Sequence, residues 1–365
     1  MFGLVIALFA CATPSTPAPT PTAAPLEQPT PTPTRLALGS CNNQRGPQDF
    51  WTTLRQTGAQ GFLMLGDNVY GDIEETAPSS PDLPELNTAY KKLGSEAAFQ
   101  AARKDMTFYT TWDDHDYGKN DSGGSFAYKA QAEALFLDFW DVPQEDPRRS
   151  RPGIYTSWLV PSQGHVLQII ALDTRFFRSD LVRGPKGGPK FLQNPDSEAT
   201  VLGEDQWAWL AATLAEPADA RLVLSSIQVI STHHGWERWD TFPTERARLL
   251  DLLSSSGNTL VVSGDRHIGG FYKLEHNGAV LYEMTSSSLN RAIPDLLLGI
   301  KKPETDPDRM GDAVVQTHFG LLDIDWENKV IRASLNHTET GEPISSQEFA
   351  LGAPKPPATG GDSPQ

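Results

Sequence analysis

A glycine-aspartate turn directly after a short apolar run is the first stretch of the sequence that could do chemistry. The run Phe62–Leu65 is followed by Gly66 and Asp67, and Tyr70 stands three residues further on. An uninterrupted apolar run of this length is typical of a buried strand, and open α/β sheets place their sites beyond the carboxyl ends of strands. An ionised Asp67 can bridge two cations, and Tyr70 can add a phenolate. For such a turn alone, the alternative is an ordinary connection that caps a helix.

Similar polar groups follow other apolar runs of the chain. The loop Trp112–Asp121 contains four aspartates and one histidine. Further candidates stand after other runs: Cys41, Arg175, Asp265 and His267. Taken one at a time, Cys41 could be a small buried residue, Tyr70 a core aromatic residue, and Arg175 an ion-pair partner of Asp173. Gathered at one sheet edge, however, so many ionisable groups would be costly without cations, and together they predict a metal site.

These groups need a scaffold that brings several strand ends together. Apolar periodicity alternates between patterns typical of strands and of helices, without an internal repeat. The expected strands are 35–38, 62–65, 106–110, 155–160, 166–172, 221–230 and 259–262, followed by a hairpin over 321–336. The expected helices are 47–57, 86–103, 126–140, 204–216 and 244–255. This alternation predicts one α/β domain over residues 35–350, with the polar strand ends converging on one edge.

The charge of the chain argues against one class of partner. The 365 residues carry a formal net charge of -16. A nucleic-acid-binding surface needs clustered Lys and Arg to neutralise phosphates, and the sequence has no such cluster. An anionic substrate would therefore be attracted by bound cations rather than by a basic surface.

Both ends of the sequence have the composition of targeting or linker segments. Residues 1–11 end in Leu8-Phe9-Ala10-Cys11 after a short apolar run, which resembles a lipobox in which Cys11 becomes lipidated. Residues 12–34 are rich in Thr and Pro and favour an extended tether, whereas 351–365 are typical of a disordered tail. We therefore expect an extracytoplasmic lipoprotein anchored to a membrane, and no protein partner. The alternative is a secreted or periplasmic protein with a plain signal peptide.

Four sequence blocks occur together at the expected strand ends. Gly66-Asp67-Asn68-Val69-Tyr70 has the form Gly-Asp-x-x-Tyr, and Asp113–Asp116 has the form Asp-Asp-His-Asp. Gly264–His267 matches a variant of a Gly-His-x-His block, and Cys41 stands where an aspartate is more usual. In number, order and position these blocks resemble those of the alkaline phosphatase D (PhoD-like) family of the calcineurin-like metallophosphatase superfamily. The resemblance covers nearly the whole body of the chain.

The resemblance implies a fold and a set of metals. The fold is a two-layer β-sandwich flanked by helices, in the order αββα. The metals are Fe3+ beside Ca2+, with other divalent metals such as Mn2+ or Zn2+ as the alternative. By this analogy Asp67 bridges the metals, and the remaining ligands are Cys41, Tyr70 and His267 for iron and Asp114 and Asp265 for calcium. The donor types agree, because thiolate, phenolate and imidazole suit a transition metal and carboxylates suit a hard cation.

The same resemblance implies a reaction, the hydrolysis of a phosphoric ester. The metals would polarise the phosphoryl oxygens and activate a water for in-line attack on phosphorus, without a covalent protein nucleophile. His115 would stand near the phosphate as hydrogen-bond donor or general acid, and Arg175 could bind the phosphoryl oxygens as a fork. Asn120 is a further candidate for the metal or the substrate.

One block of the superfamily has no secure match in this chain. Its usual histidine falls in the region filled by Ser225–Gln228, and Gln228 is a candidate for lining the pocket. His233 and His234 lie nearby, but a histidine pair in a loop is more often solvated, so the expected metal ligands include neither.

Two other functions remain open at this point. One is a phosphodiesterase that acts on a surface polymer or a phospholipid, which would share the metal centre and differ in the walls of its pocket. The other is a metal-binding protein of the cell surface that keeps the fold without turnover. The filled blocks favour an enzyme, but they do not separate monoesters from diesters.

Overall fold

The computed structural model describes residues 34–72, 80–293 and 305–352. The elements in chain order are β1 (Arg35–Gly39), α1 (Phe50–Gln56), β2 (Gly61–Leu65), α2 (Pro84–Ser95), α3 (Ala97–Asp105), β3 (Thr107–Thr111), α4 (Asp114–Tyr117), α5 (Lys129–Phe139), η1 (Pro147–Arg149), β4 (Thr156–Ser162), β5 (His165–Ala171), β6 (Val182–Arg183), β7 (Phe191–Leu192), α6 (Gly203–Ala215), β8 (Ala220–Ser225), η2 (Trp239–Thr241), α7 (Pro243–Ser256), β9 (Thr259–Ser263), β10 (Gly269–His276), β11 (Ala279–Ser286), β12 (His318–Asp325), β13 (Val330–His337) and β14 (Pro343–Ala350). The predicted lipobox and nearly all of the predicted linker and tail lie outside the described residues. Within the described ranges, no helix has the length and apolar character needed to cross a bilayer.

The fold is built on two mixed sheets, and each sheet has six strands. The first has the strand order β14-β13-β12-β1-β2-β3, and the second has the order β10-β11-β9-β8-β5-β4. Parallel pairing joins β1, β2 and β3 in the first sheet. It joins β11, β9, β8 and β5 in the second. Because parallel strands end at the same edge, each sheet brings several carboxyl ends together.

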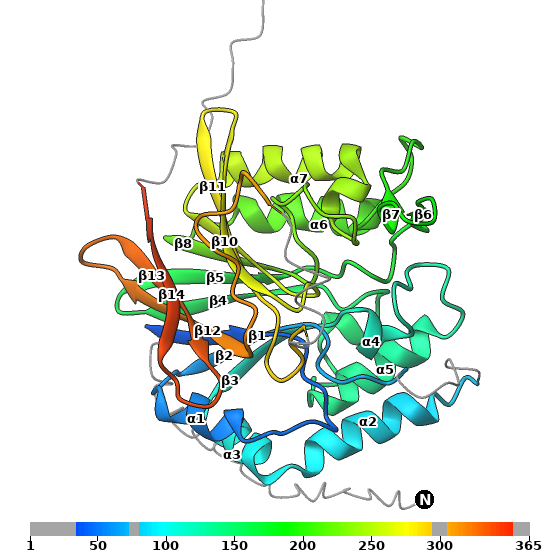
Figure 1. Ribbon diagram of the computed structural model, residues 1–365, viewed down its shortest axis with the longest axis horizontal. Helices are drawn as coiled ribbons and strands as arrows, with labels where there is room; N and C mark the ends of the chain where they lie inside the picture. Colours follow the sequence, from blue (N-terminus) through cyan, green and yellow to red (C-terminus); the bar gives the residue numbers. More distant parts are fainter. Residues whose placement is uncertain (1–33, 73–79, 294–304, 353–365) are drawn as a thin grey trace, which may run out of the picture. The chain divides into compact units, whose positions relative to one another are not determined.

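Alternating side chains along the strands explain how the sheets stack. In β2, Leu63 points into the core between the sheets, whereas Phe62 and Met64 belong to the core under the first group of helices. In β8, Leu222 packs between the sheets and Val223 packs under α6 and α7. A strand covered on both faces must be apolar on both, which explains the uninterrupted apolar runs. The resulting helix-sheet-sheet-helix layers confirm the predicted β-sandwich flanked by helices (Figure 1).

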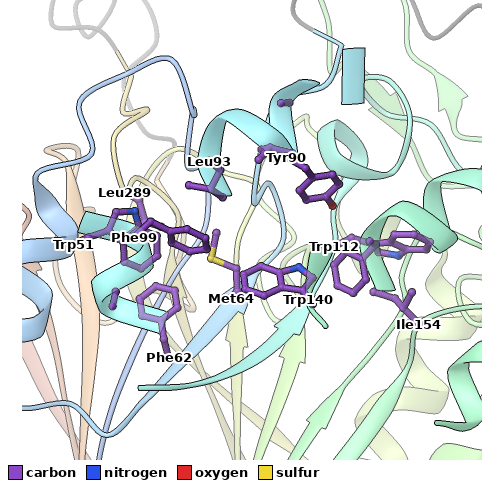
Figure 2. Close-up of a cluster of buried hydrophobic side chains, with 14 of the residues drawn as sticks. Trp51, Phe62, Met64, Tyr90, Leu93, Phe99, Trp112, Trp140, Ile154 and Leu289 are labelled. Atoms are coloured by element: carbon purple, nitrogen blue, oxygen red, sulfur yellow. The ribbon is translucent and has the colours of Figure 1, made fainter. Parts of the chain in front are cut away.

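Aromatic side chains fill the core between the first sheet and its helices, as Figure 2 shows. The ring centroid of Trp51, on α1, lies 5.2 Å from that of Phe62 on β2. It lies 5.1 Å from that of Phe99 on α3. Large buried rings of this kind remove roughly 150–250 Å² each from water, so these contacts hold both helices on the sheet. They thereby fix the strands whose ends carry the polar groups.

Most expected elements are present, with shifted ends. The expected helix 86–103 is wrong in one respect: it consists of α2 and α3, because Glu96 between them is extended with ψ of 118°. The expected strand 221–230 stops at Ser225. The expected hairpin is confirmed and is longer, with β12 paired antiparallel to β13. The sequence pattern does not predict β10, β11, β14 or the short β6–β7 pair.

Candidate active site

The predicted polar residues meet where the parallel strands of both sheets end. Cys41 follows β1, Asp67 follows β2, Asp114 follows β3 and Asp265 follows β9. Hydrogen bonds join the two sheets at this edge: the amide of Ser40 donates to the carbonyl of Ser286 at 3.1 Å, and the hydroxyl of Thr111 donates to the carbonyl of Leu172 at 2.6 Å. The convergence predicted from the strand ends is therefore present.

Four of these residues have a backbone conformation that side chains rarely adopt. The φ angle is positive at Cys41 (60°), Asp67 (50°), Asp265 (66°) and His267 (55°). The left-handed region is uncommon for any residue with a Cβ, and such conformations occur often at functional sites. Cys41, Asp67 and Asp265 each lie two residues after the end of a strand, and His267 lies in the same short turn as Asp265, between β9 and β10.

Gly66 permits the close approach of the two central loops. Its φ is 93°, and a Cβ at this position would lie 2.5 Å from the Cβ of Asp113. Asp116 then joins the loops, because its carboxylate accepts from the amides of Asp67 at 3.2 Å and Asn68 at 3.1 Å, and from that of Asp113 at 2.7 Å. Asp116 thus has a structural role in the Asp-Asp-His-Asp block.

Cys41, Asp67, Tyr70 and His267 form one side of the site. The hydroxyl of Tyr70 donates to Asp67 Oδ2 at 2.9 Å, and the Cys41 sulfur lies 3.5 Å from the same oxygen. The Ser287 hydroxyl lies 3.2 Å from the Cys41 sulfur and accepts from the amide of His267 at 2.9 Å. The His267 Nδ1 contacts the carbonyl of Arg291, which can only accept, so Nδ1 carries the proton and Nε2 keeps the lone pair that binds metals.

Carboxylates form the other side of the site. The ligand atoms of Asp113, Asp114 and Asp265 lie within 4.8 Å of one another, as do those of Asp67, Asp114 and His115. Asp114 belongs to both groups and therefore connects the two sides. All six predicted metal ligands thus lie at one site.

Unpartnered oxygen atoms show that these residues fit cations. In the described part of the chain, buried oxygens without a hydrogen-bond partner include Oδ1 of Asp67, Oδ1 of Asn68, Oδ2 of Asp113 and Oδ1 of Asp114. A buried acceptor left without a partner costs about 1–3 kcal/mol, and more when it is charged. Three of these atoms, on Asp67, Asp113 and Asp114, belong to the carboxylate groups described above and form a donor set suited to hard cations, next to a thiol, a phenol and an imidazole.

The pKa shifts of the buried carboxyls and of the thiol also indicate a site suited to cations. Burial raises the pKa of Asp67 and of Asp113 well above the usual range, and neighbouring carboxylates add to the effect. Burial likewise raises the pKa of the Cys41 thiol. For Asp265, burial together with Asp114 raises the pKa to about 6. At Asp67, Asp113 and Asp265, burial and neighbouring negative charge favour the protonated form, and a bound cation would reverse that preference.

His115 is held in place by Asp72 and by the Tyr70 ring. Its Nδ1 lies 2.5 Å from Asp72 Oδ1, and its ring centroid lies 4.2 Å from that of Tyr70. Burial alone would lower the pKa of this imidazole, but the carboxylates of Asp114, Asp67 and Asp72 outweigh it and raise the pKa well above its ordinary value. An imidazole held beside a carboxylate at the rim of the site suits the predicted role of hydrogen-bond donor or general acid.

Arg175 lies in a different environment from the one expected of a phosphate-binding residue. Its side chain is fully buried, and its guanidinium pairs with Asp113 and, at 2.7 Å, with Glu237. The amide of Arg175 donates to Asp173 Oδ1 at 2.9 Å, but the side chain does not pair with that carboxylate as the alternative suggested. This placement makes Arg175 the counter-charge of the acidic cluster, rather than a fork presented to a substrate.

The remaining candidates lie at the margin of the site. Asn120 is exposed, and its amide donates at 2.7 Å to Asp72, the partner of His115. Gln228 is buried; its side-chain amide donates to the hydroxyl of Thr285 at 2.9 Å and accepts from Arg266 at 3.2 Å. Both the amide nitrogen and the oxygen of the Gln228 side chain therefore have protein partners, and Gln228 has a structural role behind the site.

The histidine pair differs from expectation in one member. His233 is exposed as expected, with Nδ1 3.7 Å from the carboxylate of Asp306. His234 is buried, and its Nε2 is without a hydrogen-bond partner among the described residues. The expectation of a solvated pair is therefore wrong for His234, because the loop after β8 folds back over the second sheet instead of extending into water.

Other residues of the site are absent from the predicted set. The ligand atoms of Asp121 and Glu237 lie within 4.8 Å of that of Asp114, and Asp113 belongs to the group with Asp114 and Asp265. Asp113 and Asp121 stand in the same acidic loop as Asp114, so the concentration of aspartates in this loop is a sequence feature from which both could be predicted as site residues. Glu237 comes from a loop without periodicity, and only the tertiary structure brings it here.

Comparisons with known proteins agree with this geometry. The profile of the family described as PhoD-like phosphatase matches residues 36–335. Alkaline phosphatase D of Bacillus subtilis (strain 168) is 25% identical over an alignment of 235 residues, and the alignment covers 57% of this chain and 38% of that protein. The chain thus matches well under half the length of this curated relative.

Solved structures of low sequence identity share the fold. A structure of PhoD is 18% identical with a TM-score of 0.62, over 88% of this chain and 70% of that chain. The purple acid phosphatase PPD1 from yellow lupin is 11% identical with a TM-score of 0.59, over 88% and 54%. GAP50, described as the anchor in the inner membrane complex of Plasmodium, is 15% identical with a TM-score of 0.57, over 88% and 90%. Since the family profile covers most of the sequence, the chain belongs to the PhoD-like phosphatase family.

Proposed function

We propose that this protein is a metal-dependent phosphoric ester hydrolase. The observation that carries the proposal is the set of buried oxygens without partners on Asp67, Asp113 and Asp114, beside a thiol, a phenol and an imidazole. Membership of the PhoD-like phosphatase family supports it. When bound, cations at these groups would neutralise the phosphoryl oxygens and make a water more acidic.

The protein's own residues would supply orientation and a proton. His115, held by Asp72 at 2.5 Å, would donate a proton to the oxygen of the leaving group. The carboxylate of Asp116 would hold the two central loops at a fixed spacing, because it accepts from three backbone amides of those loops. Arg175 would balance the charge of Asp113 from beneath the site.

The metals that we propose are Fe3+ and Ca2+, with Mn2+ or Zn2+ as the alternative. Cys41, Tyr70 and His267 offer sulfur, phenol and imidazole donors on the side proposed for iron. Asp114 and Asp265 offer carboxylates on the side proposed for calcium. Asp67 lies within reach of both sides and would bridge them.

The proposed function is tested by metal analysis combined with rates on two substrates. We expect purified protein to contain iron and calcium and to release phosphate from an aryl monoester. A calcium chelator should abolish the rate, and added calcium should restore it. A higher rate on a bis-aryl diester would favour the phosphodiesterase that acts on a surface polymer or phospholipid. Full activity after exhaustive metal removal would refute the metal-dependent reaction.

A binding protein without turnover is the second candidate. The fold is shared with GAP50, an anchor in Plasmodium, as well as with phosphatases, so the fold alone does not decide. The filled ligand set favours catalysis. Bound metal without measurable release of phosphate from either aryl ester would favour the binding protein.

We also propose that the protein is held outside the cytoplasm by lipid on Cys11, at the end of the lipobox-like segment. The Cys11→Ala protein should then move from the membrane fraction to the soluble fraction with its specific activity unchanged. Thr13→Ala, in the adjoining Thr/Pro-rich stretch, is the matched control and should stay with membranes. A Cys11→Ala protein that still fractionates with membranes would refute the lipid anchor at Cys11, whereas a wild-type protein in the soluble fraction would favour the secreted or periplasmic alternative.

A further inference from the structure

Arg291 places a guanidinium group against the proposed metal site. Its Cζ lies 4.3 Å from the centroid of the Tyr70 ring, and its carbonyl accepts from His267 Nδ1. Tyr70 and His267 are both predicted ligands on the iron side. The Tyr70 ring also contacts His115, at a centroid distance of 4.2 Å, so the side chains of Arg291 and His115 both lie against the Tyr70 ring.

The backbone next to Arg291 is fixed by its neighbours in sequence. The side-chain amide of Asn290 donates to the carbonyls of Asn43 and Pro47, both at 2.9 Å, and its oxygen accepts from the amide of Asn43 at 2.7 Å. The amide of Leu289 donates to the carbonyl of Ser40 at 3.1 Å. These bonds join the segment after β11 to the loop that carries Cys41, so the position of Arg291 is coupled to the metal site itself.

The charge of Arg291 is not committed to a carboxylate within the described residues, where its side chain makes neither an ion pair nor a hydrogen bond. By contrast, the guanidinium of Arg175 pairs with Asp113 and Glu237, and that of Arg178 lies 2.9 Å from Glu237. A contact with the face of an aromatic ring leaves the in-plane N–H donors of a guanidinium available. A half-buried arginine with available donors at a site of this kind suits a planar, bidentate contact with phosphoryl oxygens.

We propose that Arg291, and not Arg175, binds the phosphoryl oxygens of the substrate and of the phosphate product. The proposal rests on the proposed function, since it assigns the substrate contact of the same site. His115 and Arg291 both contact the Tyr70 ring. In this arrangement the leaving group of the substrate lies toward His115, and the non-bridging oxygens lie toward Arg291. Its contribution is a charge-assisted hydrogen bond, which exists in the bound complex and not in the free protein.

The test measures phosphate affinity as well as turnover. In the metal-loaded Arg291→Gln protein we expect the KM for an aryl phosphate and the inhibition constant for inorganic phosphate to rise about 10- to 100-fold. Arg291→Lys should recover part of the affinity, because an ammonium keeps the charge without the fork. Arg248→Gln is the matched control: this arginine pairs with Glu204 at 2.7 Å on the exposed surface, and its loss should change neither constant.

Metal content separates a substrate contact from an indirect effect through Tyr70. If Arg291 only positions Tyr70, the Arg291→Gln protein should lose metal, and its affinity for phosphate should fall in proportion to the metal lost. That result would overturn the proposal. Unchanged phosphate affinity at full metal content would also overturn it. Binding of inorganic phosphate, followed by calorimetry, is measured without turnover. A wild-type protein that binds phosphate through Arg291 but hydrolyses no ester would therefore refute the proposed function and leave the contact intact.

Discussion

The Asp67→Asn protein is expected to lose its bound metals and at least about a thousandfold of its turnover, because cation catalysis supplies several kcal/mol and each 1.36 kcal/mol is about tenfold. Asp67 Oδ2 accepts from Tyr70 at 2.9 Å, and Oδ1 is buried without a partner. The amide keeps the size of the side chain and removes its charge, so both sides of the site lose a shared anionic ligand. Asparagine also tolerates the φ of 50° at this position. Metal content per chain and steady-state rates measure the change.

The same substitution is not expected to unfold the metal-free protein. Burial raises the pKa of Asp67, which means that its charged form is unfavourable there in the absence of a cation. The melting temperature of metal-free Asp67→Asn should therefore equal or exceed that of metal-free wild type. Asp105→Asn, whose carboxylate pairs with Arg55 at the surface, is the matched control and should keep metals and rate. An Asp67→Asn protein with wild-type metal content and turnover would exclude Asp67 as the bridging ligand.

Arg175→Met is expected to lower the free energy of unfolding by about 3–5 kcal/mol, the usual effect of breaking a buried ion pair by removing one partner. The guanidinium is fully buried between Asp113 and Glu237, so its loss leaves Asp113 without a counter-charge and Glu237 with Arg178 alone. Methionine fills a comparable volume, which limits the cavity contribution. Denaturant unfolding of the metal-loaded protein measures the difference.

Arg55→Met is the matched control for this experiment. Arg55 pairs with Asp105 at 2.5 Å, but both side chains are partly exposed, and such pairs contribute at most about 1 kcal/mol. A stable Arg175→Met protein with a raised KM for aryl phosphate would show instead that Arg175 reaches the substrate. That result would restore the role expected from the sequence and contradict the buried ion pair.

The sequence contains enough to predict the layers and the ligands, because both depend on local patterns. Strands covered on two faces appear as apolar runs, such as the one that contains Leu63, and the residue after each run is directed to the shared edge. Cys41, Asp67 and Asp265 can therefore be placed from their distance to a strand end alone. The chemistry of their donor atoms then indicates cations.

The parts that were not predicted depend on contacts between distant segments. Strand β11 contains Glu283, a residue typical of a solvated position, yet this glutamate is fully buried. Its carboxylate accepts from the amides of Val229 at 3.0 Å and Ile230 at 2.6 Å, which lie in the loop after β8. Because no local pattern signals that partnership, neither β11 nor Arg291 beyond it could be anticipated. The ion pair of Arg175 with Glu237 cannot be predicted from the sequence for the same reason.

The four left-handed residues restrict how this site can change during evolution or in a designed library. At Cys41, Asp67, Asp265 and His267 the backbone excludes β-branched side chains before any question of metal preference arises. Glycine, asparagine, aspartate and histidine are the residues that enter this conformation most readily. Saturation libraries at these positions would therefore recover few residue types, and most of these have side chains that ligate metals. A change of metal specificity is more accessible at Asp114 or Tyr70, which are outside the set of positive-φ positions and can accept the wider range of side chains.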